Sequence, residues 1–281
     1  MGETGSSESI ELETFVIVHS DELVLACEAE GRFADLPSYR YLFVGHGDVS
    51  RLQHLDVIVA RDLPDNIEQH VHLLSFTGWY AVARNSLTDA RWVALLEYDV
   101  SLAPDFFETT LDALQTGRRL VGYIPFPLTH HMYLGATPWL SPVLAKVHGI
   151  DVEQVIQHRL AAGGDDMWTA TTNQALAGED LRQFVDWFLP ASVYFRHDPV
   201  GAHVHERTLP MFCETQGIEN VLIPDVLEHR QQRSHGIIAF QGDAVPHDPA
   251  ELVAEPEPEP AATSRLGALV QKIRSRPQRS E

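Results

Sequence analysis

Cysteine is scarce in this chain of 281 residues, which contains only Cys27 and Cys213. Two cysteines cannot form the disulfide framework that holds many small secreted domains together, so we expect both to be small buried side chains. No apolar run approaches the roughly 20 residues of a membrane-spanning helix. The first residues are acidic and polar, whereas a secretory signal begins basic and continues apolar. The sequence therefore predicts a reducing, cytoplasmic location.

Positive charge is also in short supply. The chain has 20 Lys and Arg against 40 Asp and Glu, a formal net charge of −20. This balance argues against a general nucleic-acid-binding protein. The sequence also lacks a G-x-G-x-x-G run after its first predicted strand and has no Walker sequence. If such a chain binds a phosphate, we expect a divalent metal ion to bridge the two.

Hydrophobic residues make up 44% of the chain, enough for a substantial core. Apolar, β-branched segments alternate with amphipathic ones, which is typical of α/β proteins. We expect strands at 14–20, 39–44, 56–60, 92–96, 118–124, 169–177 and 221–224. We expect helices at 21–31, 67–85, 141–162, 178–188 and 202–215, and one that starts near 105. The sequence thus predicts a single Rossmann-like α/β domain over 14–247, with a mostly parallel central sheet flanked by helices.

The most informative stretch is 92–107. Trp92 to Leu96 is a continuous apolar run, as expected for a strand buried on both faces. The run stops at Glu97-Tyr98-Asp99, which brings two carboxylates to the carboxyl end of the strand, where open α/β sheets bind ligands. Carboxylate pairs suit Mg²⁺ or Mn²⁺, which commonly bind one or two carboxylates together with substrate phosphates.

An apolar strand, a D-x-D-like triplet and the Pro-Asp-Phe-Phe run at 104–107 together resemble the GT-A type of glycosyltransferase, here of the bacterial polysaccharide-synthesis kind. The first acid is Glu97, where the family usually has Asp. The resemblance implies that the ends of the first strands and one face of helix 67–85 bind the nucleotide of a nucleotide-sugar donor. The residues implied on this side are His19, Ser20, Asp62, Tyr80 and Arg84.

The resemblance also implies an acceptor side. Inverting members use a carboxylate as general base, because the attacking hydroxyl must lose its proton. The candidates are Asp165, Asp166, Asp180 and Asp186. We favour Asp186, since it lies between Val185 and Trp187 on an amphipathic helix, whereas the helix N-terminus explains Asp180.

Histidine and arginine gather near the end of the predicted domain. Several GT-A enzymes supply a late His to the metal and basic residues to the diphosphate. His229 and His235 fit the first role, and Arg230 and Arg233 fit the second. A surface loop rich in His and Arg is an equally good interpretation. The run His203, His205, Glu206 lacks the H-E-x-x-H zinc spacing, so we expect a structural or acceptor-facing role there.

Both ends of the chain differ in composition from the middle. We expect residues 1–13 to be a disordered tail and 248–263 to be an acidic, Pro-rich linker. Residues 264–281 form a basic segment with apolar residues at helical spacing. Residues 264–279 would suit an anionic membrane surface. A frayed tail that binds another partner, or nothing, remains an alternative.

The sequence thus predicts a metal-dependent glycosyltransferase. It would move a sugar from a nucleotide-sugar donor to a glycan or lipid-linked acceptor in cell-surface polysaccharide synthesis, on the inner face of the membrane. A nucleotidyltransferase or another sugar-phosphate enzyme on a similar sheet is one alternative, although residues 19–31 lack the Gly-rich, basic loop typical of those proteins. A non-catalytic protein that binds a glycan or a nucleotide is another.

Overall fold

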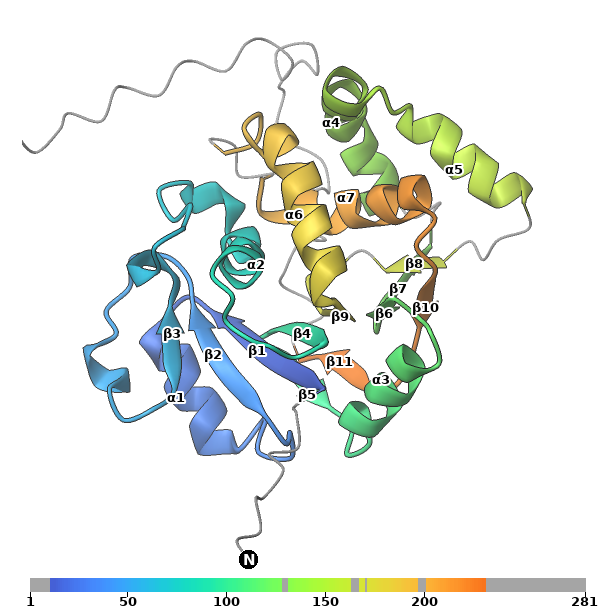
Figure 1. The fold of residues 1–281 in the computed structure, drawn as a ribbon. Helices are drawn as coiled ribbons and strands as arrows, with labels where there is room; N and C mark the ends of the chain where they lie inside the picture. The colour runs from blue at the N-terminus through green and yellow to red at the C-terminus, as the bar shows by residue number, and fades with distance from the viewer. Residues whose placement is uncertain (1–10, 128–130, 163–166, 170, 197–200, 231–281) are drawn as a thin grey trace, which may run out of the picture.

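The computed structural model describes residues 11–127, 131–162, 167–169, 171–196 and 201–230 (Figure 1). The predicted linker and basic segment, 248–281, lie outside the described residues. The same holds for residues 1–10 of the predicted tail and for four candidate site residues, Asp165, Asp166, Arg233 and His235.

A seven-stranded sheet forms the centre of the molecule, in the order β10-β6-β9-β4-β1-β2-β3. Only β9 is antiparallel to its neighbours, so the expected α/β fold with a mostly parallel sheet is confirmed. The strands are β1 (Leu12–Val18), β2 (Tyr39–Phe43), β3 (Val57–Val59), β4 (Trp92–Glu97), β6 (Leu120–Gly122), β9 (Gln174–Ala177) and β10 (Asn220–Leu222). Two short antiparallel pairs join β5 (Val100–Leu102) to β11 (Leu227–His229), and β7 (Pro125–Pro127) to β8 (Met167–Thr169).

Helices cover both faces of the central sheet. Along β1, Phe15 and Ile17 enter one core while Val16 and Val18 enter the other, so the strand is apolar on both faces from Phe15 to its end. The first core is closed by α2 (Ser75–Arg84), α4 (His131–His148), α5 (Val152–Ala161), α6 (Gly178–Ser192) and α7 (Gly201–Gln216). The second is closed by α1 (Asp21–Glu30) and α3 (Phe106–Gln115). Figure 1 shows the two groups on opposite sides of the sheet.

The strand order reverses next to β1. The chain passes outward from β1 through β2 to β3, and then returns to form β4 on the other side of β1. Ligands of open α/β sheets bind at such a switch point, beyond the carboxyl ends of the strands. Since Ile17 pairs with Glu97, the acidic triplet follows β4 at this edge.

Several element boundaries differ from those expected. β1 begins at Leu12, inside the predicted tail, because Leu12 is fully buried in the second core. The helix expected at 67–85 begins only at Ser75, after a 3-10 turn at Val71–Leu73 and a Leu74 with φ of 38°. The N-cap of α1 is Ser20, whose hydroxyl accepts the N–H of Leu23 at 3.3 Å.

Two predicted elements are divided in the structure. The helix expected at 141–162 is two helices, because Gly149 adopts a φ of 68° and Asp151 caps α5. The strand expected at 169–177 is also two elements, since β8 pairs with β7 and only β9 enters the central sheet.

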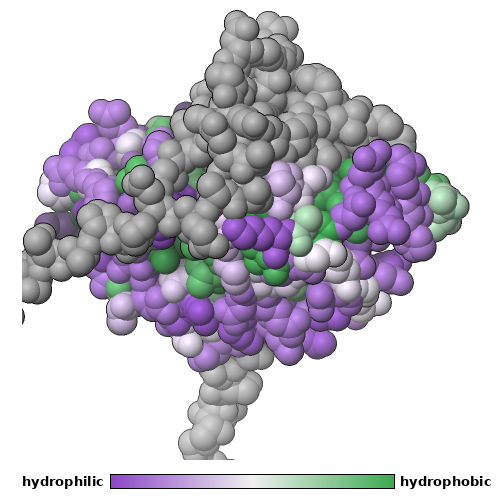
Figure 2. Space-filling view, turned by 90° about the horizontal axis from the view of Figure 1, so that it is seen from above, coloured by the Kyte–Doolittle hydropathy of each residue, from purple (hydrophilic) through white to green (hydrophobic). Residues whose placement is uncertain are grey.

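The described surface is mostly hydrophilic when seen from above, with small hydrophobic patches between polar regions (Figure 2). Two large hydrophobic side chains among the described residues are exposed, Val71 and Leu74. Within the described ranges, no helix has both the length and the apolar character needed to span a membrane.

Candidate functional site

Hydrogen bonds to its backbone carbonyls hold the acidic triplet in place. Arg32 donates from Nη1 to the carbonyl of Tyr98 at 2.6 Å, and the N–H of Arg230 donates to the carbonyl of Asp99 at 2.8 Å. These two bonds tie the segment to α1 and to the end of β11. Asp99 is only 6% exposed, and Glu97 is half-buried. The carboxylates therefore have fixed positions at the edge of the sheet.

Glu97 is oriented by two polar residues from separate elements. Ser75, the first residue of α2, donates from Oγ to Oε1 of Glu97 at 2.8 Å. Asn173, just before β9, accepts the backbone N–H of Glu97 at 2.7 Å. Asn173 and its neighbour Thr172 are fully buried, which is unusual for polar side chains unless they form hydrogen bonds.

His229 reaches Asp99 because β11 pairs with β5, which directly follows the triplet. Nδ1 of His229 lies 3.6 Å from Oδ1 of Asp99, and its Nε2 lies 3.5 Å from Nδ2 of Asn173. The predicted metal ligands Glu97, Asp99 and His229 thus lie in one neighbourhood, although they come from distant parts of the sequence.

A third carboxylate, Glu206 of α7, joins this group. It accepts hydrogen bonds from Oγ1 of Thr172 and from Nη1 of Arg207, both at 2.9 Å. Arg207 is 3% exposed, so this is an ion pair removed from bulk water. We call Glu97, Asp99, Glu206 and His229 the carboxylate cluster.

The cluster perturbs the acidity of its members. Burial raises the pKa of Glu97, and the charges of Glu206 and then Asp99 raise it further, to about 7. Burial lowers the pKa of His229, but its hydrogen bond to Asp99 and the charges of Asp99 and Glu97 outweigh that effect and raise it. The carboxylates of the cluster repel one another, and a bound cation would reduce that repulsion.

The oxygen atoms of the cluster would supply only part of the coordination shell of a divalent metal ion. Within the described ranges, no three His, Cys, Asp or Glu side chains stand close enough to form a complete metal site. Mg²⁺ usually keeps several waters and takes one or two carboxylates plus substrate phosphates. The carboxylate oxygens of Glu97 and Asp99 are hard ligands that suit such partial coordination, and Asp99 is nearly buried.

Among the described residues predicted for the nucleotide side, Arg230 approaches the triplet with its backbone N–H and His19 approaches it with its side chain. The ring of His19 meets the ring of Tyr98 edge-on, with 5.2 Å between centroids. The hydroxyl of Ser20 caps α1, which gives it a structural role. Asp62 is exposed after β3. Arg230 is exposed and forms an ion pair with Glu30, so its guanidinium points at α1.

Two residues that the sequence did not single out organise the loop after β2. Arg61 donates to the carbonyls of Gly45 and Gly47 at 3.0 and 2.8 Å. Glu68 is 3% exposed and accepts the N–H of Gly45. A Cβ at Gly47 would lie 3.3 Å from the carbonyl of His19, so this loop approaches the end of β1 closely.

Tyr80, Arg84 and Asp186 belong to a different surface. Tyr80 donates to Oδ1 of Asp65 at 2.6 Å, and the guanidinium of Arg84 lies over its ring. Arg84 also pairs with Asp186 at 3.1 Å, and the Asp186 side chain is 56% exposed. Because α2 runs away from Ser75, Arg84 lies about 13 Å further along its axis. The structure therefore places Tyr80 and Arg84 away from the Ser75 end of α2 that contacts Glu97, and the assignment of these three residues to the donor and acceptor sides stays a prediction.

Asp180, another candidate for the general base, also lies away from the cluster. It is 2% exposed and accepts from both Nε, at 3.0 Å, and Nη2 of Arg119. Since Ala177 pairs with Trp92, α6 begins at the amino edge of the sheet, about 16 Å along β4 from Glu97. Asp180 is therefore a structural carboxylate on the opposite edge from the cluster.

His205 lies in the core rather than in a metal site. It is fully buried, with its ring 5.8 Å from that of Phe76 and 5.4 Å from that of Trp79. Its neighbour Glu206 belongs to the carboxylate cluster. Of these two consecutive residues of α7, His205 therefore packs in the core and Glu206 contributes to the candidate site.

Comparison with known proteins gives little more. No family model matches the sequence, and no curated protein matches it. Among solved structures, the chain is similar to the apo form of WbbM, which is described as a bifunctional glycosyltransferase, with 12% identity and a TM-score of 0.48. The matched region covers 79% of this chain and 45% of that one, so this chain spans less than half of that protein's length.

Proposed function

We propose that this protein is a metal-dependent glycosyltransferase of the GT-A type, which takes a sugar from a nucleoside-diphosphate sugar. The observation that carries the proposal is the carboxylate cluster at the switch point of a mostly parallel sheet. Acidic residues from β4 and α7 and a histidine from β11 meet there. A purely structural arrangement would not need two further carboxylates whose charges raise the proton affinity of Glu97.

Asp99 and Glu97, with His229 beside them, would hold Mn²⁺ or Mg²⁺. The ion would supply positive charge to the leaving diphosphate. The chain's own residues keep the cluster in order, since Ser75 and Asn173 fix the carboxylate and backbone of Glu97. Ser75 is the first residue of α2 and Asn173 directly precedes β9, so regular elements rather than one loop position the two residues that contact Glu97.

The donor's nucleoside would lie at the carboxyl ends of β1 and β2. Support comes from the His19–Tyr98 contact and from the Gly45–Gly47 loop, which Arg61 and Glu68 hold against the end of β1. In this proposal Arg61 and Glu68 organise the donor side in place of Asp62 and Tyr80.

For an inverting reaction we assign the general base to Glu206 instead of Asp186 or Asp180. Glu206 is the carboxylate whose charge affects Glu97 most, and Thr172 and Arg207 set its orientation. It would accept the proton of the attacking acceptor hydroxyl. A retaining reaction would need no such base.

The acceptor in this proposal is a glycan or a lipid-linked sugar in cell-surface polysaccharide synthesis at the cytoplasmic side of a membrane. The basic pattern of 264–279 supports a membrane location, since Lys and Arg near a surface are attracted to anionic lipids.

Calorimetric titration of UDP, GDP and CMP, each with and without Mn²⁺, tests the proposal. We expect one nucleotide to bind only with Mn²⁺, and Asp99→Ala to weaken that binding at least about tenfold. Asp186→Ala removes the same charge from a remote, exposed site and is the matched control, expected to bind like the wild type. Nucleotide binding without metal that survives Asp99→Ala would contradict the proposal, as would no binding at all.

A further inference from the structure

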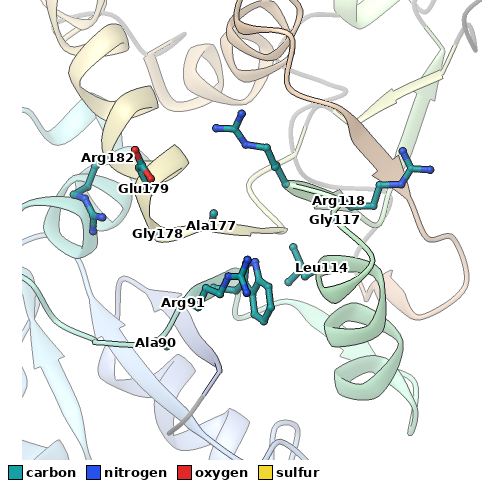
Figure 3. A pocket seen from close by; sticks show the side chains of 11 residues that line it. Ala90, Arg91, Leu114, Gly117, Arg118, Ala177, Gly178, Glu179 and Arg182 are labelled. Carbon is teal, nitrogen blue, oxygen red and sulfur yellow. The ribbon is translucent and has the colours of Figure 1, made fainter.

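A cavity of about 410 Å³ lies at the amino edge of the central sheet, where β4 and β6 begin and β9 ends. It is separated from the carboxylate cluster by the length of β4, about 16 Å. We call it the arginine cavity, after four of the residues that line it, Arg91, Arg118, Arg119 and Arg182 (Figure 3). None of these residues takes part in the proposed transfer reaction.

The charge of this cavity is opposite to that of the chain. The sequence has 20 Lys and Arg and a net charge of −20, yet four arginines meet at one cavity. Glu179 is the single acid among its lining residues. The cavity is thus a local exception in a strongly acidic protein.

Two of the four arginines already have acidic partners. Arg119 donates to both carboxylate oxygens of Asp180 from Nε and Nη2, and Arg118 pairs with Glu219. Both remain close to half exposed, at 49% and 45% of their side-chain surface. Their charge is therefore reduced but not removed from the cavity.

Arg91 and Arg182 are different, since neither forms an ion pair with any residue in the described ranges. Both side chains are exposed. The guanidinium of Arg91 lies over the ring of Trp92, 4.5 Å from its centroid, so a cation–π contact positions it beside the cavity. Figure 3 shows Arg91 between Arg182 on one side and Arg118 on the other.

Small residues leave the cavity open. Gly117, with a φ of 96°, and Gly178 both line it, and a Cβ at Gly117 would meet nothing within 4 Å. The helix α6 begins at Gly178 without a side-chain cap, so its positive end faces the same space. The volume lies within the range of small-molecule pockets.

We propose that the arginine cavity is a second binding site, which takes a small ligand or a headgroup through a phosphate group. Arginine suits this chemistry, because its planar guanidinium donates two parallel hydrogen bonds to phosphate oxygens. The phosphate pairs with Arg91 and Arg182, whose donors no acid in the described ranges occupies, and Arg118 and Arg119 add charge at the rim.

Calorimetric titration of inorganic pyrophosphate in EDTA tests the site without a metal ion. Saturable binding is expected for the wild type, and the double variant Arg91→Gln, Arg182→Gln should weaken it at least about tenfold. Arg51→Gln, which removes an exposed arginine that pairs with Asp21, is the charge control and should change little. The single variant Arg182→Gln, on an exposed helix position, should lie between wild type and double variant.

No saturable binding by the wild type at millimolar pyrophosphate would overturn the proposal. So would equal weakening by Arg51→Gln, since that points to overall charge alone. Mn²⁺-dependent nucleotide binding should be unchanged in the double variant, which reports that the variant is folded. Metal-independent nucleotide binding that the double variant loses belongs to the arginine cavity and not to the carboxylate cluster, which separates this site from the transferase proposal.

Sedimentation of the full chain with vesicles that contain phosphatidic acid identifies the source of the phosphate. Weaker vesicle binding by the double variant, together with weaker pyrophosphate binding, would identify a lipid headgroup. Unchanged vesicle binding with weaker pyrophosphate binding would identify a soluble phosphate ligand.

Discussion

Three acidic side chains come together near the carboxyl end of β4, and each contacts a different polar or basic residue. Glu97 is bound by Ser75, Asp99 faces His229, and Glu206 is paired with Arg207. Such a group is stable without a cation only if one member takes up a proton or a neighbour supplies charge. The raised pKa values of Glu97 and His229 show both effects.

The stability of the metal-free protein should therefore fall as the pH rises. The pKa of Glu97 in the fold is about 7, above its usual 4.5, so the fold binds this proton more tightly than the unfolded chain. The stabilisation is complete below about pH 4.5 and is lost as the pH passes 7. The raised pKa of His229 acts in the same direction. Urea unfolding in EDTA should give a free energy roughly 2–3 kcal/mol lower at pH 8 than at pH 5.

Glu97→Gln should remove most of that difference, because the amide does not titrate. Glu228→Gln changes an exposed acid next to His229 and is the control, expected to keep the wild-type dependence. A stability that rises from pH 5 to pH 8 in the wild type would contradict this account of the cluster.

Sequence reasoning at this scale succeeded where the signal was local. Glu97 and Asp99 follow an apolar run directly, so their place at a strand end could be predicted from neighbouring residues. For Glu206 the sequence left a structural and an acceptor-facing role open, because its position depends on how α7 packs against α2 and α6. Asp186 was favoured because an acid among apolar helix residues looked out of place. Its side chain in fact lies on the exposed face and pairs with Arg84.

At the scale of elements, two helices begin with glycine for different reasons. α7 begins at Gly201, where a Cβ would lie 2.5 Å from the carbonyl of Phe195 and 3.1 Å from that of His72. α6 begins at Gly178, where a Cβ would meet nothing nearer than 3.8 Å. Only the first glycine is required by close packing against backbone, and it sets the position of the helix that carries Glu206.

Gly201→Ala should therefore destabilise the protein by about 1–3 kcal/mol, since backbone atoms must move to admit the methyl group. Gly178→Ala is the matched control and should stay within about 0.5 kcal/mol of the wild type. Urea denaturation measures both. Equal effects of the two substitutions would mean that α7 does not depend on this close approach.

The elements that the sequence misjudged are those decided by tertiary contacts. The helix at 141–162 contains Gly149 followed by Asp151, a local stop and start signal that a continuous helical pattern obscured. β8 and β9 read as one strand because nothing local shows that the first half pairs with β7 and the second with β4. The strands of the central sheet were predictable from apolar runs, whereas their partners and the short strands β5, β7 and β11 were not.

At the scale of the whole molecule, the two edges of the sheet differ in charge. The carboxylate cluster lies at the carboxyl edge and the arginine cavity at the amino edge. Within the described ranges, both cores are built from residues between Leu12 and Leu227.

Deletion of residues 255–281 should abolish binding to anionic vesicles, because it removes the basic segment 264–279. Thermal unfolding and Mn²⁺-dependent nucleotide binding should be unchanged, since the cluster lies within the described residues. Sedimentation with vesicles that contain phosphatidylserine measures the effect. Full vesicle binding by the shortened chain would eliminate the anchor.

The central claim is that the carboxylate cluster holds a divalent metal ion together with a nucleotide. Anomalous diffraction at the manganese edge, from crystals grown with Mn²⁺ and the nucleotide that calorimetry selects, tests it most directly. The account predicts an anomalous peak about 2.0–2.5 Å from a carboxylate oxygen of Asp99, next to the nucleotide phosphates. A bound nucleotide whose phosphates lie away from Asp99, or a manganese peak elsewhere, would contradict it.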